Sequence, residues 1–290
     1  MNKLIFGCGY LGSRIARRWR DAGSTVHVVT RSCDRAAEFA AQGYQPIVAD
    51  VNADVNDASS LVDLPVVDTV LVAIGYDRSE RHTIEQVYAE GLRHVLAALP
   101  AATGRVIYIS STGVYGQTDD QWVDETTPCS PTRAGGIACL AAERVLAVHS
   151  FFPRSVILRL AGIYGPGRVP YLDRLEAGEP IPAAAQGLLN LIHVDDAVTT
   201  VLAVAAATDL PATYCVSDGH PIERSAYYAE VARLIGAPPP RFVVPDADLH
   251  AAQRATSSKR VRNTRLLADL SLQLAYPTYR EGLAAILADR

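Results

Sequence analysis

Basic clusters and paired cysteines are absent from this sequence of 290 residues. It has 27 lysines and arginines against 31 aspartates and glutamates, a formal net charge of -4, and no run of positive charge. Nucleic acids and anionic membranes are therefore not expected partners. Neither the histidines nor the cysteines have metal-ligand or C-x-x-C spacing, so we expect no metal site and no disulfide framework. Unpaired thiols favour a reducing, cytoplasmic location. The scattered cysteines are Cys8, Cys33, Cys129, Cys139 and Cys215.

Long apolar runs are also missing. The first one, Leu4–Phe6, ends at Gly7 and is too short for the core of a secretion signal or for a membrane-spanning helix. Hydrophobic residues make up 49% of the chain and charged residues 20%, a balance typical of a packed globular protein. The length fits one large domain or two closely joined ones.

In the first half of the chain, short apolar runs rich in β-branched residues alternate with stretches of helical periodicity. This alternation predicts an α/β fold, a Rossmann doubly wound parallel sheet with helices on both faces. Such sheets bind ligands at the carboxyl ends of their strands. The predicted strands are Lys3–Phe6, Val26–Val29, Pro46–Ala49, Thr69–Ala73, Arg105–Ile109 and Ser155–Leu160, and the predicted helices are Leu11–Ala22, Asp34–Ala41, Ser79–Leu99 and Ala138–Val148.

After Leu160 the pattern changes. Gly162–Pro170 is rich in glycine and proline and is predicted to be a loop, and most of the chain beyond it has helical periodicity. We expect a dinucleotide-binding domain over residues 1–163, to which residues 189–208 return. Residues 164–188 and 209–290 are expected to form a smaller, mostly helical C-terminal lobe on the substrate side.

The first motif is a G-x-G-x-x-G sequence between the first predicted strand and helix. Its glycines suit a tight turn, a close approach of the backbone to a pyrophosphate, and close packing of helix on strand. The helix N-terminus adds N–H donors and the positive end of a dipole. The motif therefore predicts a dinucleotide site formed by Gly7, Cys8, Gly9, Tyr10, Leu11 and Gly12.

The end of the second strand favours NADP over NAD. An acidic residue there would bind the ribose hydroxyls of NAD, but this chain has Arg31 and Ser32, with Arg35 one turn later. Guanidinium groups pair well with a 2′-phosphate, although surface arginines are also common. The Asp50 carboxylate either accepts a hydrogen bond from the adenine amino group or caps the turn that follows. Further cofactor contacts are expected at the strand ends, from Val51, Ala73, Ile74, Gly75 and Ser110.

Three later segments follow in a fixed order: S-S-T-G-V-Y-G from Ser110, L-R-L-A-G-I-Y-G-P-G from Leu158, and H-V-D-D from His193. With the glycine motif, this order resembles an atypical branch of the extended short-chain dehydrogenase/reductases, the NAD-dependent epimerase/dehydratase family. The resemblance covers nearly the whole chain. It implies an NAD(P)-dependent oxidoreductase or epimerase acting on a sugar-like hydroxylated substrate. The basic residues Arg133, Arg168 and Arg174 around the expected cleft suggest an anionic substrate, such as a phosphorylated compound or a nucleotide sugar, although they also fit ordinary surface charge. A homodimer is the assembly to expect.

This chain also departs from the family's usual pattern, at a pair of catalytic residues. The family carries a Tyr-x-x-x-Lys pair, with the lysine four residues before a glutamate. Counting back from Glu143 places Cys139 at the lysine position and Gly135 at the tyrosine position, and neither neighbouring register supplies a phenol or an amine. The family's tyrosine is the general acid/base, and its lysine lowers the tyrosine pKa and holds the nicotinamide ribose. Glycine and cysteine do neither.

Four residues are candidates for the remaining chemistry. Ser111 matches the family's catalytic serine or threonine, and Tyr115, Tyr164 and His193 border the expected cleft. Each also has a structural explanation: a strand-end hydroxyl satisfying a loop, packed tyrosines and a core histidine. Two functions therefore stay open, an enzyme with a non-standard acid/base and a catalytically inactive NADP-binding sensor or regulatory module. A structural scaffold is disfavoured, because a scaffold needs no dinucleotide motif.

Overall fold

The computed structural model describes residues 1–53, 61–77, 81–243 and 258–288. Their elements, in chain order, are β1 (Asn2–Phe6), α1 (Gly12–Asp21), β2 (Thr25–Thr30), α2 (Cys33–Ala41), β3 (Gln45–Val48), β4 (Thr69–Val72), the π-helical turn η1 (Gln86–Glu90), α3 (Gly91–Ala98), β5 (Arg105–Ser111), the 3-10 turn η2 (Thr112–Val114), β6 (Gln121–Val123), α4 (Ala134–Ala147), the 3-10 turn η3 (Phe152–Arg154), β7 (Ser155–Leu160), β8 (Gly162–Tyr164), α5 (Leu172–Glu176), β9 (Leu188–Leu189), β10 (Leu191–His193), α6 (Val194–Ala206), β11 (Thr213–Val216), β12 (Ile222–Glu223), α7 (Arg224–Leu234), β13 (Lys259–Val261), α9 (Thr264–Asp269) and α10 (Tyr279–Leu287).

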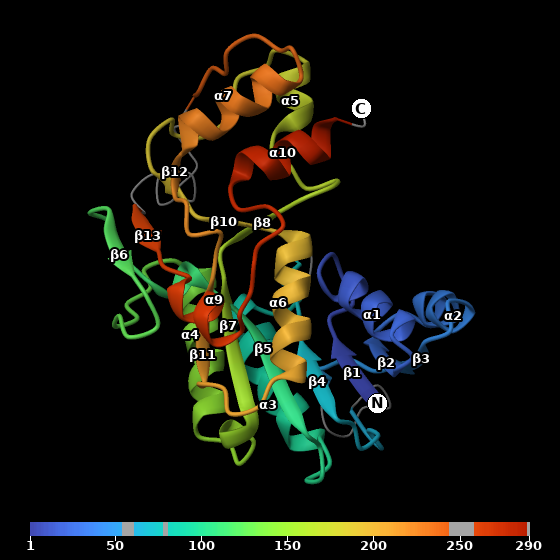
Figure 1. Cartoon of the computed structure of the whole chain (residues 1–290). Helices are drawn as coiled ribbons and strands as arrows, with labels where there is room; N and C mark the ends of the chain where they lie inside the picture. Colours follow the sequence, from blue (N-terminus) through green and yellow to red (C-terminus); the bar gives the residue numbers. More distant parts are fainter. Residues whose placement is uncertain (54–60, 78–80, 244–257, 289–290) are drawn as a thin grey trace. The chain divides into compact units, whose positions relative to one another are not determined.

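A seven-stranded sheet with the order β11-β7-β5-β4-β1-β2-β3 confirms the predicted fold class (Figure 1). The pairs β1–β2, β1–β4, β2–β3 and β4–β5 are all parallel. The chain winds outward from β1 in both directions, so that β1 and β4 stand next to each other at the point where the winding reverses. A dinucleotide binds outside the carboxyl ends of the strands at such a point.

Side chains on alternate strand positions face opposite sides of the sheet. On one face, Leu4 and Phe6 of β1 pack with buried residues of α3 and α4 in a single core cluster. On the other face, Lys3 of β1 lies under Trp19 of α1, with its amino group 5.4 Å from the ring centroid. Helices therefore cover both faces of the sheet.

The described chain divides into two compact units. One consists of residues 1–114, 134–159 and 200–214, and the other of residues 115–133, 160–199 and 215–290. The second unit contains a core of its own, in which buried residues of α5, α7 and α10 pack together. The predicted division into residues 1–163 with 189–208, and residues 164–188 with 209–290, stays a prediction.

Two element predictions need correction. The loop predicted at Gly162–Pro170 begins with the strand β8, which pairs in parallel with β10. The helix predicted from Ala138 begins earlier, at Ala134, and includes Gly135 and Gly136. Glycine is a poor helix former, but the first turns of α4 are supported by packing against η1 and η2.

The helix predicted at Ser79–Leu99 starts outside the described residues. Within the described residues, η1 and α3 form this helix from Gln86 to Ala98.

Candidate active site

The glycine motif forms a tight loop between β1 and α1. Gly7 has a φ of +89°, and a Cβ at Gly7 would clash with the Ala73 carbonyl, while one at Gly12 would clash with the Gly7 carbonyl. Both positions therefore require glycine for reasons internal to the fold. A Cβ at Gly9 would meet nothing within 4 Å. The open space at Gly9 is where a ligand can approach the backbone.

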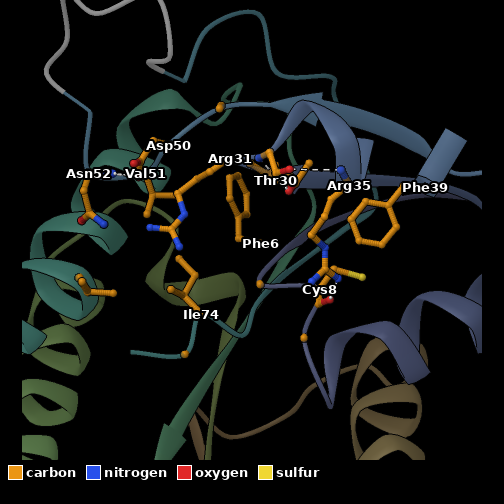
Figure 2. Close-up of a pocket in the computed structure, with 17 residues that line it drawn as sticks. Phe6, Cys8, Thr30, Arg31, Arg35, Phe39, Asp50, Val51, Asn52 and Ile74 are labelled. Atoms are coloured by element: carbon orange, nitrogen blue, oxygen red, sulfur yellow. Dashed lines mark hydrogen bonds between the residues drawn. The ribbon is translucent and has the colours of Figure 1, made fainter. Parts of the chain in front are cut away.

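A cavity of about 500 Å³ lies at this loop, which is within the usual size of a small-molecule site. Figure 2 shows the side chains that surround it, drawn from the carboxyl ends of β1, β2, β3 and β4. Predicted cofactor residues among its lining are Gly7, Cys8, Gly9, Arg31, Ser32, Arg35, Asp50, Val51, Ile74 and Gly75. The structure thus brings together residues that are far apart in the sequence.

The arginines that follow β2 face this cavity from two directions. In Figure 2 the Arg31 side chain extends toward Ile74, whereas Arg35 extends toward Cys8. A guanidinium nitrogen of Arg35 lies 3.5 Å from the Cys8 carbonyl oxygen. The Ser32 hydroxyl accepts the Arg35 backbone N–H at 3.3 Å and caps α2. Ser32 therefore fixes the start of the helix that carries Arg35.

Cys8 lies in the loop itself but has no nucleophilic character. Burial raises the pKa of its thiol to about 11, and the nearby positive charge of Arg35 only partly opposes this. The thiol is therefore protonated at neutral pH. Cys8 contributes its backbone to the loop.

Asp50 follows β3 and closes a turn. One of its carboxylate oxygens accepts the Asn52 backbone N–H at 2.9 Å, as expected for the capping alternative. The Val51 carbonyl lies 2.8 Å from the His94 ring on α3. These two contacts stabilise the turn that follows β3, beside the cavity.

The remaining predicted cofactor residues are not part of the cavity lining. Tyr10 and Leu11 complete the loop, and the Tyr10 ring lies 4.1 Å from the Arg14 guanidinium. The Ala73 carbonyl lies against the loop at Gly7. The sequence did not identify several lining residues, because they belong to no motif. Phe39 lies in α2 and Val87 in η1, and the others lie at or near strand ends: Phe6, Val29, Thr30, Ala49 and Asn52.

A buried ion pair lies beneath the end of β5. The Arg159 guanidinium on β7 donates two hydrogen bonds to the Glu143 carboxylate on α4, at 3.0 and 2.7 Å. The Ser110 hydroxyl donates to the same carboxylate at 2.6 Å. Ser110 is therefore part of a buried polar network that ties β5, α4 and β7 together. Nothing in the sequence patterns indicated this network.

The two positions at which the sequence comparison expects the family's tyrosine and lysine lie on α4. A Cβ at Gly135 would be 3.8 Å from the Ile84 side chain. Cys139 is buried, and its thiol contacts the Ser110 hydroxyl and the Ser111 backbone. Burial, aided by the negative charge of Glu143, raises the pKa of this thiol to about 12. Cys139 is therefore neither a cation nor a thiolate at neutral pH.

Ser111 ends β5, where its hydroxyl accepts the Gly113 backbone N–H at 3.0 Å. This bond leaves the hydroxyl proton for another acceptor. Ser111 also belongs to the same compact unit as the cavity.

The other three candidates belong to the second unit and are fully buried. The Tyr115 hydroxyl donates to the Asp124 carbonyl at 2.7 Å, and the Tyr164 hydroxyl to the Thr278 carbonyl at 3.4 Å. The Tyr164 and His193 rings meet edge to face at 5.3 Å. Burial raises the pKa of the Tyr164 phenol. The structure brings Tyr164 and His193 together, in an environment that favours packing roles.

The second unit also buries a lysine that the sequence patterns did not reveal. Lys259 on β13 donates to the Tyr115 carbonyl at 2.8 Å. Burial lowers the pKa of its amino group to about 8, and the positive charge of Arg133 adds to the effect.

The second unit contains a cavity of about 430 Å³. Its lining includes Arg168, Asp173 and Arg174.

Within the described ranges, histidines, cysteines, aspartates and glutamates do not gather into groups of three that would hold a metal ion. In the same residues, no helix has both the length and the apolar character needed to cross a membrane.

This chain is similar to known proteins over nearly its whole length. Protein YeeZ of Escherichia coli strain K12 is 29% identical over 283 residues, which is 94% of this chain and 95% of YeeZ. The 3-diazoavenalumate denitrifying reductase of a Streptomyces species is 28% identical, over 98% of this chain and 99% of that one. The Bordetella bronchiseptica enzyme WbmG, solved in complex with NAD and UDP, shares the fold with a TM-score of 0.80. The match covers 99% of this chain and 93% of WbmG at 18% identity.

A family model provides the assignment. It matches residues 4–216, a range that includes the glycine loop, the Ser110 and Leu158 segments and the H-V-D-D segment. The chain therefore belongs to the NAD dependent epimerase/dehydratase family.

Proposed function

We propose that this chain is an NAD(P)-dependent oxidoreductase or epimerase that binds NADP in preference to NAD. The observation that carries the proposal is the cavity at the carboxyl ends of β1–β4, which combines open space at Gly9 with two arginines after β2. An acidic residue is absent from the cavity wall directly after β2, where Arg31 and Ser32 stand. A bound nicotinamide would supply the hydride acceptor or donor.

The residues present fit such a cofactor. The backbone around Gly9 and the N-terminus of α1 would hold the pyrophosphate. Arg31 and Arg35 would hold the 2′-phosphate of NADP through charge-assisted hydrogen bonds. Asp50 and the turn after β3 would contact the adenine. The similarly folded WbmG was solved in complex with NAD, which supports a dinucleotide as the ligand, while the preference for NADP rests on the arginines of this chain.

The acid/base chemistry is proposed to be non-standard. Gly135 offers no phenol and Cys139 offers no charge, so the proton transfer must use another group. Ser111 is the candidate within the cofactor-binding unit, and Tyr115, Tyr164 and His193 are the candidates in the second unit. The alternative is a catalytically inactive NADP-binding sensor or regulatory module. The residues at Gly135 and Cys139 also fit this alternative, which predicts cofactor binding without turnover.

The proposed substrate is an anionic hydroxylated compound, phosphorylated or a nucleotide sugar. Arg168 and Arg174 line one cavity of the second unit and would provide positive charge for it. The UDP in the WbmG complex supports this substrate class, and the reductase activity named for the Streptomyces relative supports an oxidoreductase. We further propose that the protein acts in the cytoplasm and assembles as a homodimer.

Turnover on a panel of UDP- and dTDP-sugars, measured at saturating NADP⁺ and NADPH, tests the proposal. General acid–base catalysis typically contributes about 10²–10⁴-fold, so we expect little turnover of the family's usual nucleotide sugars. Brisk turnover of those sugars would contradict the non-standard acid/base. Activity on another anionic substrate should fall in Ser111→Ala. An activity that survives Ser111→Ala combined with Tyr115→Phe, Tyr164→Phe and His193→Ala would place the chemistry elsewhere.

A further inference from the structure

A tyrosine that belongs to no sequence motif lies beside the cofactor cavity. Tyr88 is the middle residue of η1, partly buried against the core on the α3–α4 face of the sheet. Its hydroxyl accepts the Tyr76 backbone N–H at 3.3 Å. Tyr76 directly follows Gly75, and Val87 directly precedes Tyr88, and both Gly75 and Val87 line the cavity. The hydroxyl is therefore hydrogen-bonded to the segment that follows β4, one residue beyond a residue that lines the cavity.

The sheet order indicates which part of a dinucleotide would reach this segment. The two mononucleotide halves lie on either side of the point where the strand order reverses. Arg31 and Asp50 follow β2 and β3 and therefore mark the adenosine side. The sheet continues from β1 through β4 to β5 on the other side, and the nicotinamide half must lie along those strand ends. Tyr88 is on this nicotinamide side.

The surroundings of Tyr88 connect it with the end of β5. Burial raises the pKa of its phenol, and the Cys139 thiol on α4 adds to the effect. That thiol in turn contacts Ser110 and the Ser111 backbone. The phenol is therefore protonated at neutral pH. Its oxygen accepts from Tyr76, and a phenolic hydroxyl that accepts one hydrogen bond can still donate its own proton.

We propose that the Tyr88 hydroxyl donates a hydrogen bond to the ribose of the nicotinamide half of the bound dinucleotide. The inference rests on the proposed function, which places a dinucleotide in this cavity. It assigns a cofactor contact to η1, between the glycine loop and the serine segment, where no motif indicated one.

Calorimetric titration of Tyr88→Phe with NADP⁺ and with adenosine 2′,5′-bisphosphate tests this contact. The bisphosphate keeps the adenosine and the 2′-phosphate but has no nicotinamide ribose. Loss of one hydrogen bond predicts about threefold to tenfold weaker binding of NADP⁺ and unchanged binding of the bisphosphate. Retained binding of the bisphosphate also shows that the cavity is folded. If NAD⁺ is the tighter ligand, NAD⁺ and AMP form the equivalent pair.

Tyr108→Phe is the matched control, since Tyr108 is a buried phenol on β5 of the same core cluster. It should bind both ligands like the wild type. The inference is overturned if Tyr88→Phe binds NADP⁺ as tightly as the wild type, or if it loses affinity for both ligands equally. A wild-type protein that binds neither dinucleotide would overturn the proposed function, and this contact with it.

Discussion

Backbone carbonyl groups leave no room for a Cβ at Gly7 and Gly12, whereas a Cβ at Gly9 would meet nothing within 4 Å. One sequence motif thus contains two glycines that the fold requires and one that we propose serves a ligand. The sequence predicts all three, because the motif stands between a strand and a helix. It does not separate their roles, since the clashes at Gly7 and Gly12 involve backbone atoms whose positions only the folded chain defines.

The arginines after β2 give a residue-scale prediction. Arg31→Ala would remove the proposed charge-assisted contact to the 2′-phosphate, and such a contact contributes about 1.5–3 kcal/mol, or roughly tenfold or more in affinity. We expect weaker binding of NADP⁺ and nearly unchanged binding of NAD⁺, measured by fluorescence titration. Arg17→Ala, at an exposed position of α1, serves as the control and should change neither affinity. An equal loss for both dinucleotides would argue against recognition of the phosphate.

Among the elements, β5, α4 and β7 are joined by a network that was not predicted. Arg159, Glu143 and Ser110 come from three separate segments, and a buried ion pair has no local sequence pattern. The strands of the main sheet were predicted from their short apolar runs, most of which are buried, although the edge strand β3 is partly exposed. β6, β8, β12 and β13 were missed because each is three residues or fewer and is defined by a distant partner strand.

The buried pair predicts a large effect on stability. Arg159→Ala leaves the Glu143 carboxylate buried without its guanidinium, and breaking such a pair costs about 3–5 kcal/mol. Urea unfolding should show this loss in the free energy of unfolding. Arg144→Ala, at an exposed position next to Glu143 on α4, should change the free energy of unfolding by less than about 0.5 kcal/mol. A similar, small effect of both variants would mean that the pair does not stabilise the unit.

The H-V-D-D segment joins a helix start to a distant part of the chain. Asp195 and Asp196 lie in the first turn of α6, where negative charge stabilises a helix. Asp196 also accepts the backbone N–H groups of Ala275 and Tyr276, at 2.7 and 3.0 Å. This carboxylate therefore anchors the segment that leads into α10, some 80 residues later in the chain. Such a contact is invisible in a sequence taken alone.

For the molecule as a whole, the pH dependence of stability should contain a contribution from Asp218. Burial raises the pKa of this carboxyl from 3.8 to about 7, assisted by the charge of Asp196 and opposed by the His220 backbone N–H and ring. The folded state therefore retains a proton that the unfolded state has lost between these two values. Stability from this group is present below about pH 4 and is lost as the pH rises to about 7.

Asp218→Asn removes this titration and keeps an oxygen acceptor for the His220 N–H. The variant should gain stability over the wild type as the pH rises. Between pH 5 and pH 8 the gap should grow by on the order of 2–3 kcal/mol, measured by chemical unfolding at both values. A gap that is constant with pH would show that Asp218 ionises normally in the folded protein.

Titration of the wild type and of Gly9→Val with NADP⁺ and NAD⁺ is the most direct test of the central claim, that a nicotinamide dinucleotide binds at the glycine loop. A Cβ at Gly9 would meet nothing within 4 Å, so the melting temperature of Gly9→Val should match that of the wild type, while its side chain would project into the space proposed for the pyrophosphate. The account predicts that the wild type binds both dinucleotides, NADP⁺ more tightly, and that Gly9→Val binds neither. Equal binding by a correctly folded Gly9→Val protein, or no binding by the wild type, would contradict it.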